Sequence, residues 1–237
     1  MKDLSFLKNN LIAHRGLHNK EIPENSIKAF ENAIKNNYII ELDIHLLKDN
    51  NIVVFHDDNL KRMCNVNKKI KDLTYEELQK YSLKKTRYKI PLFSEVLKLV
   101  DGKVPLIIEF KYDLKAGKLE REAVRLLDNY KGLFCVKSFN PMSVYWFKKH
   151  RNNYIRGLLV DSKWSTLGEI LSSSMILKRL CKPDFLSCKY ILLNNKKVKK
   201  FALNKPVLCW TIRNKNNYLK YKDKFYNLIC ENIDEFK

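Results

Sequence analysis

Residues 11–46 read LIAHRGLHNKEIPENSIKAFENAIKNNYIIELDIHL and carry the pattern on which the fold prediction rests. A short apolar run, Leu11–His14, is followed by a loop and then by Ser26–Asn36, where apolar side chains recur at helical spacing. A second apolar run, Tyr38–Leu46, begins directly after that helix. Strand, helix and strand in this order predict one unit of an α/β fold.

The same alternation continues along the chain, with further amphipathic segments at 115–130 and 141–150. Repeated strand–helix units over this length favour a closed (β/α)8 TIM barrel over an open doubly wound sheet, and the chain has no GxGxxG phosphate loop. We expect a single barrel domain over 1–237, with a small insertion at 58–91 near the mouth of the site. The expected strands are Leu11–His14, Tyr38–Leu46, Ile52–His56, Leu106–Lys111, Leu133–Ser138, Ile155–Val160, Asp184–Cys188, Pro206–Ile212 and Asn227–Cys230.

The composition narrows the class of partner. The formal net charge is +20, but the basic residues are spread along the chain, so no nucleic-acid partner is expected and a weak association with an anionic membrane surface stays open. No apolar run approaches the roughly 18 residues of a membrane span. The first ten residues lack the apolar core of a secretory signal, so a cytoplasmic location is expected. The six cysteines form no CxxC pair and are expected to be reduced thiols.

Carboxylates alternate with apolar residues in the second strand. Glu41, Asp43 and His45 lie two residues apart, so their side chains point to one side of the strand. Two parallel carboxylates can bind a hard divalent cation, although an ordinary half-exposed strand gives the same pattern.

A hairpin is expected after this strand, because the link from Lys48 to Asn51 is too short for a helical crossover. If Asp49 and Asn50 form a two-residue turn, counting outward places Asp43 opposite His56. This register brings a histidine beside the carboxylates. A slip of one residue would turn His56 to the other face.

A third acidic candidate is Glu109, which ends an apolar run and shares a strand face with Lys111. A salt-bridged rim is the alternative interpretation of this pair. In a barrel, however, polar residues at the carboxyl ends of strands line the face that bears the active site.

Polar residues thus stand at successive strand ends: His14 and Arg15, Glu41 and Asp43, His56, and Glu109 and Lys111. In this order they resemble the motifs of the glycerophosphodiester phosphodiesterase family, and the resemblance runs from about residue 10 to the carboxyl terminus. The chain departs from the family at Cys230-Glu231-Asn232, where a Thr-Asp-x-Pro motif is frequent, and the alcohol group of the substrate is not assigned. The matching motifs are HRG (14–16), PEN (23–25), ELD (41–43), HD (56–57), EFK (109–111), SF (138–139) and WT (210–211).

The resemblance implies a role for each matched position. It also implies one divalent cation, Mg²⁺ or Ca²⁺, as cofactor. It favours a position of Trp210 in the wall of the glycerol pocket over a position in the barrel core. The implied roles are an acid–base pair, His14 and His56; metal ligands Glu41, Asp43 and Glu109; phosphate contacts Arg15 and Lys111; and a supporting substrate-site residue, Asn25.

We therefore expect an enzyme that hydrolyses small glycerophosphodiesters to glycerol 3-phosphate and an alcohol, with metal and histidine catalysis. One alternative is a lysophospholipase D-like enzyme acting on lysophospholipids at the same site. Another is a non-enzymatic basic module that binds nucleic acid or an anionic surface. The sequence assigns neither the oligomeric state nor the histidine that acts as the acid.

Overall fold

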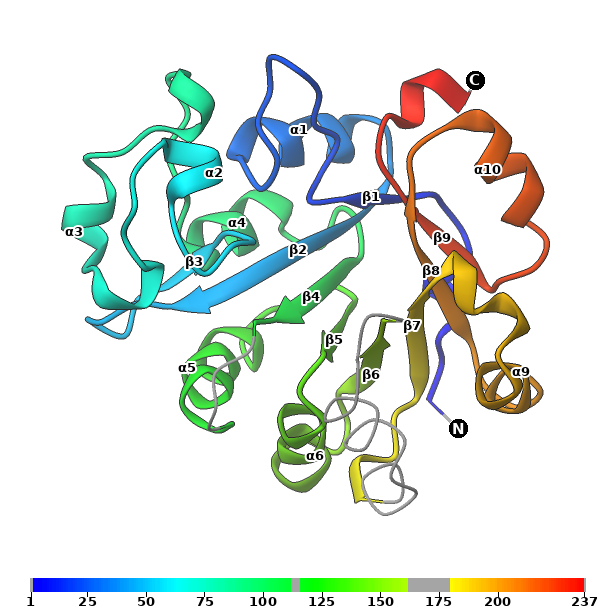
Figure 1. The fold of residues 1–237 in the computed structure, drawn as a ribbon. Helices are drawn as coiled ribbons and strands as arrows, with labels where there is room; N and C mark the ends of the chain where they lie inside the picture. The colour runs from blue at the N-terminus through cyan, green and yellow to red at the C-terminus, as the bar shows by residue number, and fades with distance from the viewer. Residues whose placement is uncertain (1, 112–115, 162–179, 237) are drawn as a thin grey trace.

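Eight parallel strands form a closed barrel in this computed structural model, which describes residues 2–111, 116–161 and 180–236 (Figure 1). The first strand pairs in parallel with both the second and the last, which joins the two ends of the sheet. The prediction of a (β/α)8 barrel is confirmed. The barrel strands are β1 (Ile12–His14), β2 (Ile39–Leu46), β4 (Leu106–Phe110), β5 (Phe134–Ser138), β6 (Ile155–Val160), β7 (Phe185–Lys189), β8 (Val207–Ile212) and β9 (Asn227–Cys230).

The barrel interior is apolar at the amino ends of the strands and polar at their carboxyl ends. Ile12, Ile39 and Ile107 pack in one buried cluster with side chains of the short 3-10 helix η1 (Ser5–Leu7), which covers the amino-terminal end. Side chains alternate along a strand, so residues two positions further on face the same interior. Those residues are His14, Glu41 and Glu109. The strand pattern therefore places its polar groups at the mouth of the barrel.

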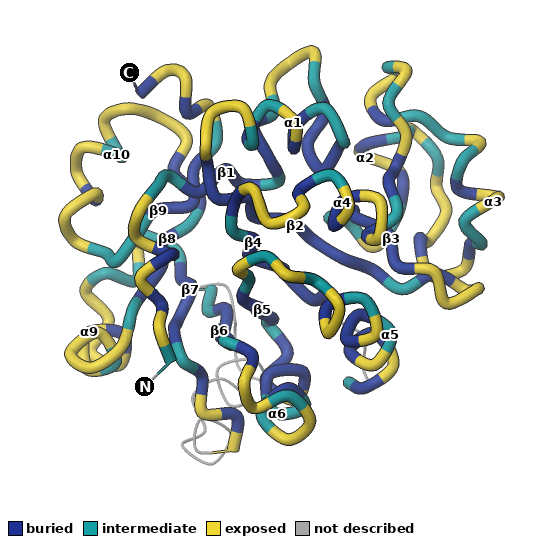
Figure 2. Tube along the Cα trace, turned by 180° about the vertical axis from the view of Figure 1, so that it is seen from behind, coloured by how far each residue is buried: buried dark blue, intermediate teal, exposed yellow. Residues whose placement is uncertain are grey.

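Helices cover the outside of the barrel, with their apolar faces toward the strands and their outer faces exposed (Figure 2). The first begins where the sequence predicts, because Ser26 caps it by accepting a hydrogen bond from the Ala29 N–H at 3.2 Å. The covering helices are α1 (Ile27–Lys35), α4 (Phe93–Val100), α5 (Lys118–Leu127), α6 (Pro141–His150), α9 (Lys196–Ala202) and α10 (Lys215–Tyr221).

The hairpin forms, but its predicted register is wrong by one residue. The antiparallel partner of β2 is β3 (Ile52–Val54), and the residue opposite Asp43 is Phe55, whose N–H donates to the Asp43 carbonyl at 2.9 Å. His56 follows the end of β3, where the chain bends. His56 therefore does not share a strand face with the carboxylates.

The turn explains this difference. It has three residues, Lys48–Asn50, because the Leu47 N–H donates to the Asn51 carbonyl at 2.8 Å. Asn50 adopts a left-handed conformation with φ of 68°, as expected for the last residue of a three-residue hairpin loop. Each added turn residue shifts the register by one, which a count based on a two-residue turn misses.

The segment 58–91 packs around an apolar cluster of its own beside β3. Thr74 caps the short helix that follows it and forms a capping box with Glu77. The buried side chains of this cluster come from the hairpin and from the short helices of the segment. These helices are α2 (Lys61–Cys64), η2 (Ile70–Asp72), α3 (Tyr75–Leu78) and η3 (Leu83–Lys85).

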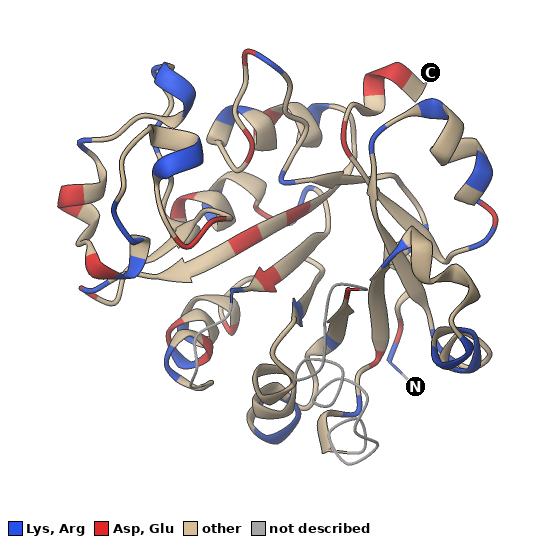
Figure 3. Cartoon of the chain, in the orientation of Figure 1, with Lys and Arg blue, Asp and Glu red and all other residues tan. Residues whose placement is uncertain are grey.

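Lysine and arginine residues are spread over the helices and loops, and acidic residues are present there and also on the strands β2 and β4 in the middle of the barrel (Figure 3). Within the described ranges, no helix combines the length and the apolar character that a membrane crossing requires. All six cysteines lie in described residues and are free thiols, five of them buried.

Candidate active site

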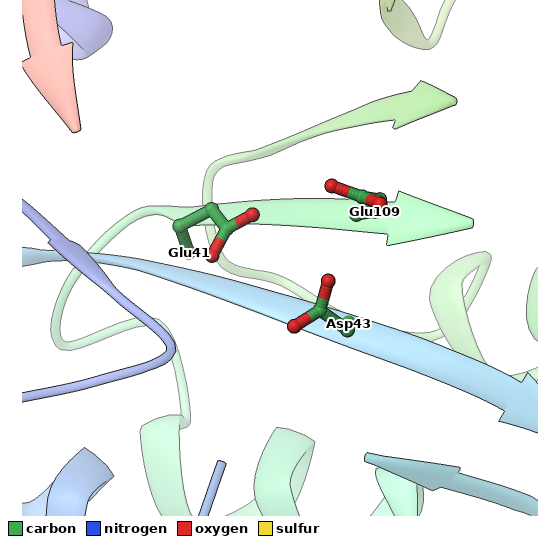
Figure 4. Close-up of side chains that lie close together, drawn as sticks. All are labelled: Glu41, Asp43 and Glu109. Atoms are coloured by element: carbon green, nitrogen blue, oxygen red, sulfur yellow. The ribbon is translucent and has the colours of Figure 1, made fainter. Parts of the chain in front are cut away.

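Three buried carboxylates meet at the carboxyl ends of β2 and β4. Glu41, Asp43 and Glu109 are each at most 6% exposed. One oxygen of each lies within 4.8 Å of the others. Figure 4 shows the three side chains close together, two on β2 and one on β4. Asp43 stands directly beside Glu109 because β2 and β4 are paired in parallel in this register. The structure therefore brings together the three residues predicted as metal ligands.

Cationic side chains surround this cluster. Lys111 Nζ lies 2.8 Å from Asp43 Oδ1 and also contacts Glu109, and Arg15 Nε lies 3.3 Å from Asp43 Oδ2. The backbone N–H of Arg15 donates to Glu41 Oε2 at 3.1 Å. These contacts hold the loop after β1 against the carboxylates. Both predicted phosphate contacts thus lie at the cluster.

The charges in this cluster stabilise one another despite burial. Burial alone would raise the pKa of Asp43, but Lys111 and Arg15 hold it well below its usual range. Burial also favours neutral Glu109, and Lys111 outweighs this effect and lowers its pKa. Lys111 in turn has a raised pKa, because Asp43 and Glu109 outweigh the effect of its burial. Asp43 and Glu109 are therefore ionised at neutral pH.

The donor set fits a hard divalent cation. Three carboxylates supply the oxygen ligands that Mg²⁺ and Ca²⁺ prefer. Asn25 is 2% exposed and donates from Nδ2 to Asp43 Oδ2 at 2.9 Å. Its Oδ1 is buried and has no hydrogen-bond partner within the described residues. Asn25 thus places a further oxygen atom, which could serve as a metal ligand, beside the carboxylates.

The carboxylate of Glu231, which directly follows β9, orients His14. Its Nδ1 lies 2.6 Å from Glu231 Oε1, and Glu231 also accepts a hydrogen bond from Arg213 Nε at 2.7 Å. Burial would raise the pKa of Glu231, but the bonds to His14 and Arg213 lower it below its usual range. Glu231 is therefore ionised and accepts a hydrogen bond from the Nδ1–H group of His14. The other ring nitrogen, Nε2, lies 3.9 Å from Glu41 Oε2.

His56 has a matching arrangement. Its Nδ1 lies 2.6 Å from Asp57 Oδ1, and Arg62 Nε donates to the other oxygen of Asp57 at 2.7 Å. Burial would raise the pKa of Asp57, but its hydrogen bonds to His56 and Arg62 lower it. His45 Nε2 lies 3.2 Å from the His56 carbonyl and holds the chain at the bend. In both catalytic candidates, Nδ1 is paired with a carboxylate and Nε2 is the remaining ring nitrogen.

His14 and His56 line one pocket of about 440 Å³, in spite of the shifted hairpin register. Trp210 and Phe139 line the same pocket, and their ring centroids are 5.8 Å apart. Trp210 Nε1 is buried and has no hydrogen-bond partner in the described part of the chain. Trp210 therefore lies at the pocket, whereas Lys111 lines a neighbouring pocket of about 260 Å³ together with Lys69 from segment 58–91.

Glu24 links the loop after β1 to segment 58–91. Its carboxylate contacts Arg15 Nη1 at 2.6 Å and Arg62 Nη2 at 2.6 Å. Burial would raise the pKa of Glu24, but Arg62 and Arg15 lower it from 4.5 to about 2. The stabilising effect of these pairs is therefore complete above pH 4.5 and is lost as the pH falls toward 2.

Glu24→Gln is expected to weaken the dependence of stability on pH in this acidic range. Between pH 6 and pH 3, the wild-type free energy of unfolding should fall by about 1 kcal/mol more than that of the variant. The pKa shift alone corresponds to about 2 kcal/mol over this range, and solvent screening at the half-exposed Arg62 reduces it. Urea denaturation at the two pH values measures this difference. Glu31→Gln, on the exposed face of α1, is the matched control. Equal pH dependence in wild type and Glu24→Gln would contradict the assignment.

Sequence reasoning missed several residues of the site. Lys137 is 3% exposed, and its Nζ lies 2.7 Å from Glu41 Oε1. A lysine inside the apolar run 133–138 was the available signal. Glu231 directly follows β9, and Asp57 directly follows His56. Whether either carboxylate pairs with a histidine depends on the folded geometry. Glu24 lies within a matched motif, yet its partner Arg62 is 38 residues away.

Comparisons with known proteins agree with this geometry. Residues 14–230 match the model of the glycerophosphoryl diester phosphodiesterase family. YhdW of Bacillus subtilis, provisionally named a glycerophosphodiester phosphodiesterase, is 32% identical over 222 residues, which cover 89% of this chain and 88% of that protein. Human lysophospholipase D GDPD1 is 46% identical over 71 residues, but these cover 30% of this chain and 22% of that protein.

A solved structure shares the fold. It is a phosphodiesterase of Oleispira antarctica in complex with its product, sn-glycerol 3-phosphate. The TM-score is 0.76 at 21% identity, and the match covers 95% of this chain and 93% of the other.

Proposed function

The chain belongs to the glycerophosphoryl diester phosphodiesterase family and is a phosphoric diester hydrolase, and we propose that it cleaves glycerophosphodiesters to glycerol 3-phosphate and an alcohol. We further propose that one divalent cation, Mg²⁺ or Ca²⁺, is its cofactor and that His14 and His56 form the acid–base pair. The observation that carries the proposal is the pairing of each histidine Nδ1 with a carboxylate, beside the cluster of Glu41, Asp43 and Glu109.

The two histidines would carry out the proton transfers from Nε2. One accepts the proton of the attacking hydroxyl group, and the other donates a proton to the departing alkoxide oxygen as the phosphorus–oxygen bond breaks. Glu231 and Asp57 are positioning residues, because each holds Nδ1 of one ring and so fixes which nitrogen faces the pocket. The bond made and the bond broken are both at phosphorus. After this step the accepting histidine carries an extra proton and the donating histidine has lost one, so release of one proton to solvent and uptake of another return both to their starting states.

The charge of the phosphodiester requires cations near the carboxylate cluster. Glu41, Asp43 and Glu109 would hold the divalent ion, which when bound offsets charge on the phosphoryl oxygens. Arg15 lines the same pocket as both histidines and would contact the phosphate directly. Lys111 pairs with Asp43 and Glu109, so we propose that it acts at the edge of the phosphate site.

The pocket also suits a small alcohol. Trp210 and Phe139 form an aromatic wall that would pack against the carbon atoms of the glycerol group. Asn25 would support this site through Asp43. Segment 58–91 supplies Arg62, which holds Asp57, so we propose that it shapes the mouth of the site within one barrel domain.

The test is the release of glycerol 3-phosphate from glycerophosphocholine, with lysophosphatidylcholine assayed in parallel. We expect release from the small diester at a rate at least about tenfold above that from the lysophospholipid, because segment 58–91 beside the pocket is mostly basic and polar and offers little apolar surface to an acyl chain. A preference for lysophosphatidylcholine would support the lysophospholipase D alternative, which the short match to that class favours. Hydrolysis of neither substrate would contradict the proposed substrate class.

A further inference from the structure

A buried lysine with no part in the proton transfers stands against two of the proposed metal ligands. We propose that Lys137 is a resident cation of the carboxylate cluster, which competes with the divalent ion for Glu41 and Glu109 and thereby weakens metal binding. This inference rests on the proposed function, in which these carboxylates hold the ion. It extends that function by naming a residue that controls metal affinity.

The contacts of Lys137 place its ammonium group among the carboxylates. Lys137 Nζ lies 2.7 Å from Glu41 Oε1 and 3.5 Å from Glu109 Oε2. The side chain is about 2% exposed, and Glu41 is fully buried. The position follows from the barrel, because Lys137 is paired in register with Glu109 on the neighbouring strand. A buried ammonium group in this place is strongly attracted to the carboxylates.

The charges of the cluster are already balanced without a metal ion. Three carboxylates face three basic side chains, and these are Arg15, Lys111 and Lys137 in the described part of the chain. A divalent ion therefore meets little net negative charge. It gains the attraction of three carboxylates only if one of the basic groups gives up its contacts.

Lys137 is the basic group whose departure frees a ligand oxygen. Arg15 is also paired with Glu24, and Lys111 bridges Asp43 and Glu109. Lys137 is the cation beside Glu41 Oε1, at 2.7 Å, and within the described residues this oxygen has no other polar partner. Lys137 also lines the 440 Å³ pocket, which gives its ammonium group space to move away. Movement of one side chain would thus open Glu41 Oε1 to the ion.

The experiment titrates Mg²⁺ and Ca²⁺ into chelator-treated protein by isothermal titration calorimetry. Lys137→Met is expected to lower the metal Kd by about tenfold or more, because it leaves the cluster with an excess negative charge. Lys137→Arg keeps the charge and should retain a Kd close to that of wild type. Lys189→Met is the matched control: Lys189 lines the same pocket, but its Nζ pairs with Asp161, 2.7 Å away, which is not in the carboxylate cluster.

The outcomes separate this inference from the proposed function. An unchanged Kd in Lys137→Met, with clear metal binding by wild type, overturns the role of Lys137 and leaves the proposed function in place. Absence of metal binding by wild type overturns the proposed cofactor and this inference with it. An equal decrease of the metal Kd in Lys189→Met also overturns the inference, because loss of any positive charge near the pocket would then explain the tighter binding.

A second measurement applies if Lys137→Met does not fold. Lys137→Gln replaces the ammonium group by a polar neutral group and is titrated in the same way. If it also fails to fold, a crystal structure of wild-type protein soaked in CaCl₂ decides. We expect Lys137 Nζ to leave Glu41 Oε1 when the ion binds, and retention of the ion pair beside a bound ion would overturn the proposal.

Discussion

Alanine at either His14 or His56 is expected to lower kcat/KM for glycerophosphodiester hydrolysis by about 10²- to 10⁴-fold, the range typical of general acid–base catalysis. Each substitution removes one of the two proposed proton transfers and leaves the other histidine in place. Initial rates of glycerol 3-phosphate release measure the loss. The variant with both substitutions should lose much less than the product of the two single effects, because residues that act as one unit are not additive.

Folding controls make this result interpretable. His56 lies beyond the end of β3 with its side chain one-third exposed, so we expect His56→Ala to unfold at nearly the wild-type temperature. His150→Ala is the matched control for loss of an imidazole, because His150 stacks on Trp146 at the exposed end of α6. It should retain wild-type kcat/KM. Wild-type turnover in both His14→Ala and His56→Ala would refute the assignment.

The barrel was predictable from the sequence because its strands are nearly continuous apolar runs separated by amphipathic helices. The polar layer at the mouth was predictable for a related reason. The run YIIELDIHL places Glu41 and Asp43 on one strand face, and the run LIIEFK places Glu109 at the end of another. Local patterning is sufficient when the residues in question lie on regular strands.

The position of His56 shows where local patterning fails. The register of a hairpin depends on the backbone conformation of its turn, and the left-handed Asn50 adds a residue that the pattern of apolar positions does not reveal. His56 still reaches the pocket, because the chain bends after β3 and His45 holds the His56 carbonyl. The sequence thus predicted that His56 lies at the site from a hairpin register that is wrong by one residue.

Partners that are distant in the chain were also beyond sequence reasoning. Glu231 lies 217 residues from His14 and meets it only because β9 closes the barrel against β1. Lys137 meets Glu41 across the interior of the barrel, and neither residue is adjacent to the other in sequence or strand order. A charged residue inside an apolar strand indicates a buried partner, but the fold decides which one it is.

Removing the divalent ion is the second change with a large expected effect. In the presence of EDTA, we expect turnover of glycerophosphocholine to fall by about 10²-fold or more, and added Mg²⁺ or Ca²⁺ should restore it. Without the ion, Lys111 and Lys137 remain tied to the carboxylates, so they cannot replace the lost charge at the phosphate. Undiminished turnover after exhaustive chelation would contradict the proposed cofactor.

Glu109→Gln tests the dependence of turnover on the divalent ion by changing a proposed metal ligand instead of removing the ion with a chelator. This substitution leaves Lys111 paired with Asp43 and Lys137 paired with Glu41, so both lysines keep a buried partner and the variant should fold. Loss of one anionic ligand should raise the metal concentration needed for half-maximal activity by about tenfold or more. If the variant instead loses activity that no concentration of Mg²⁺ or Ca²⁺ restores, while its metal Kd stays at the wild-type value, Glu109 acts on the substrate and not as a metal ligand.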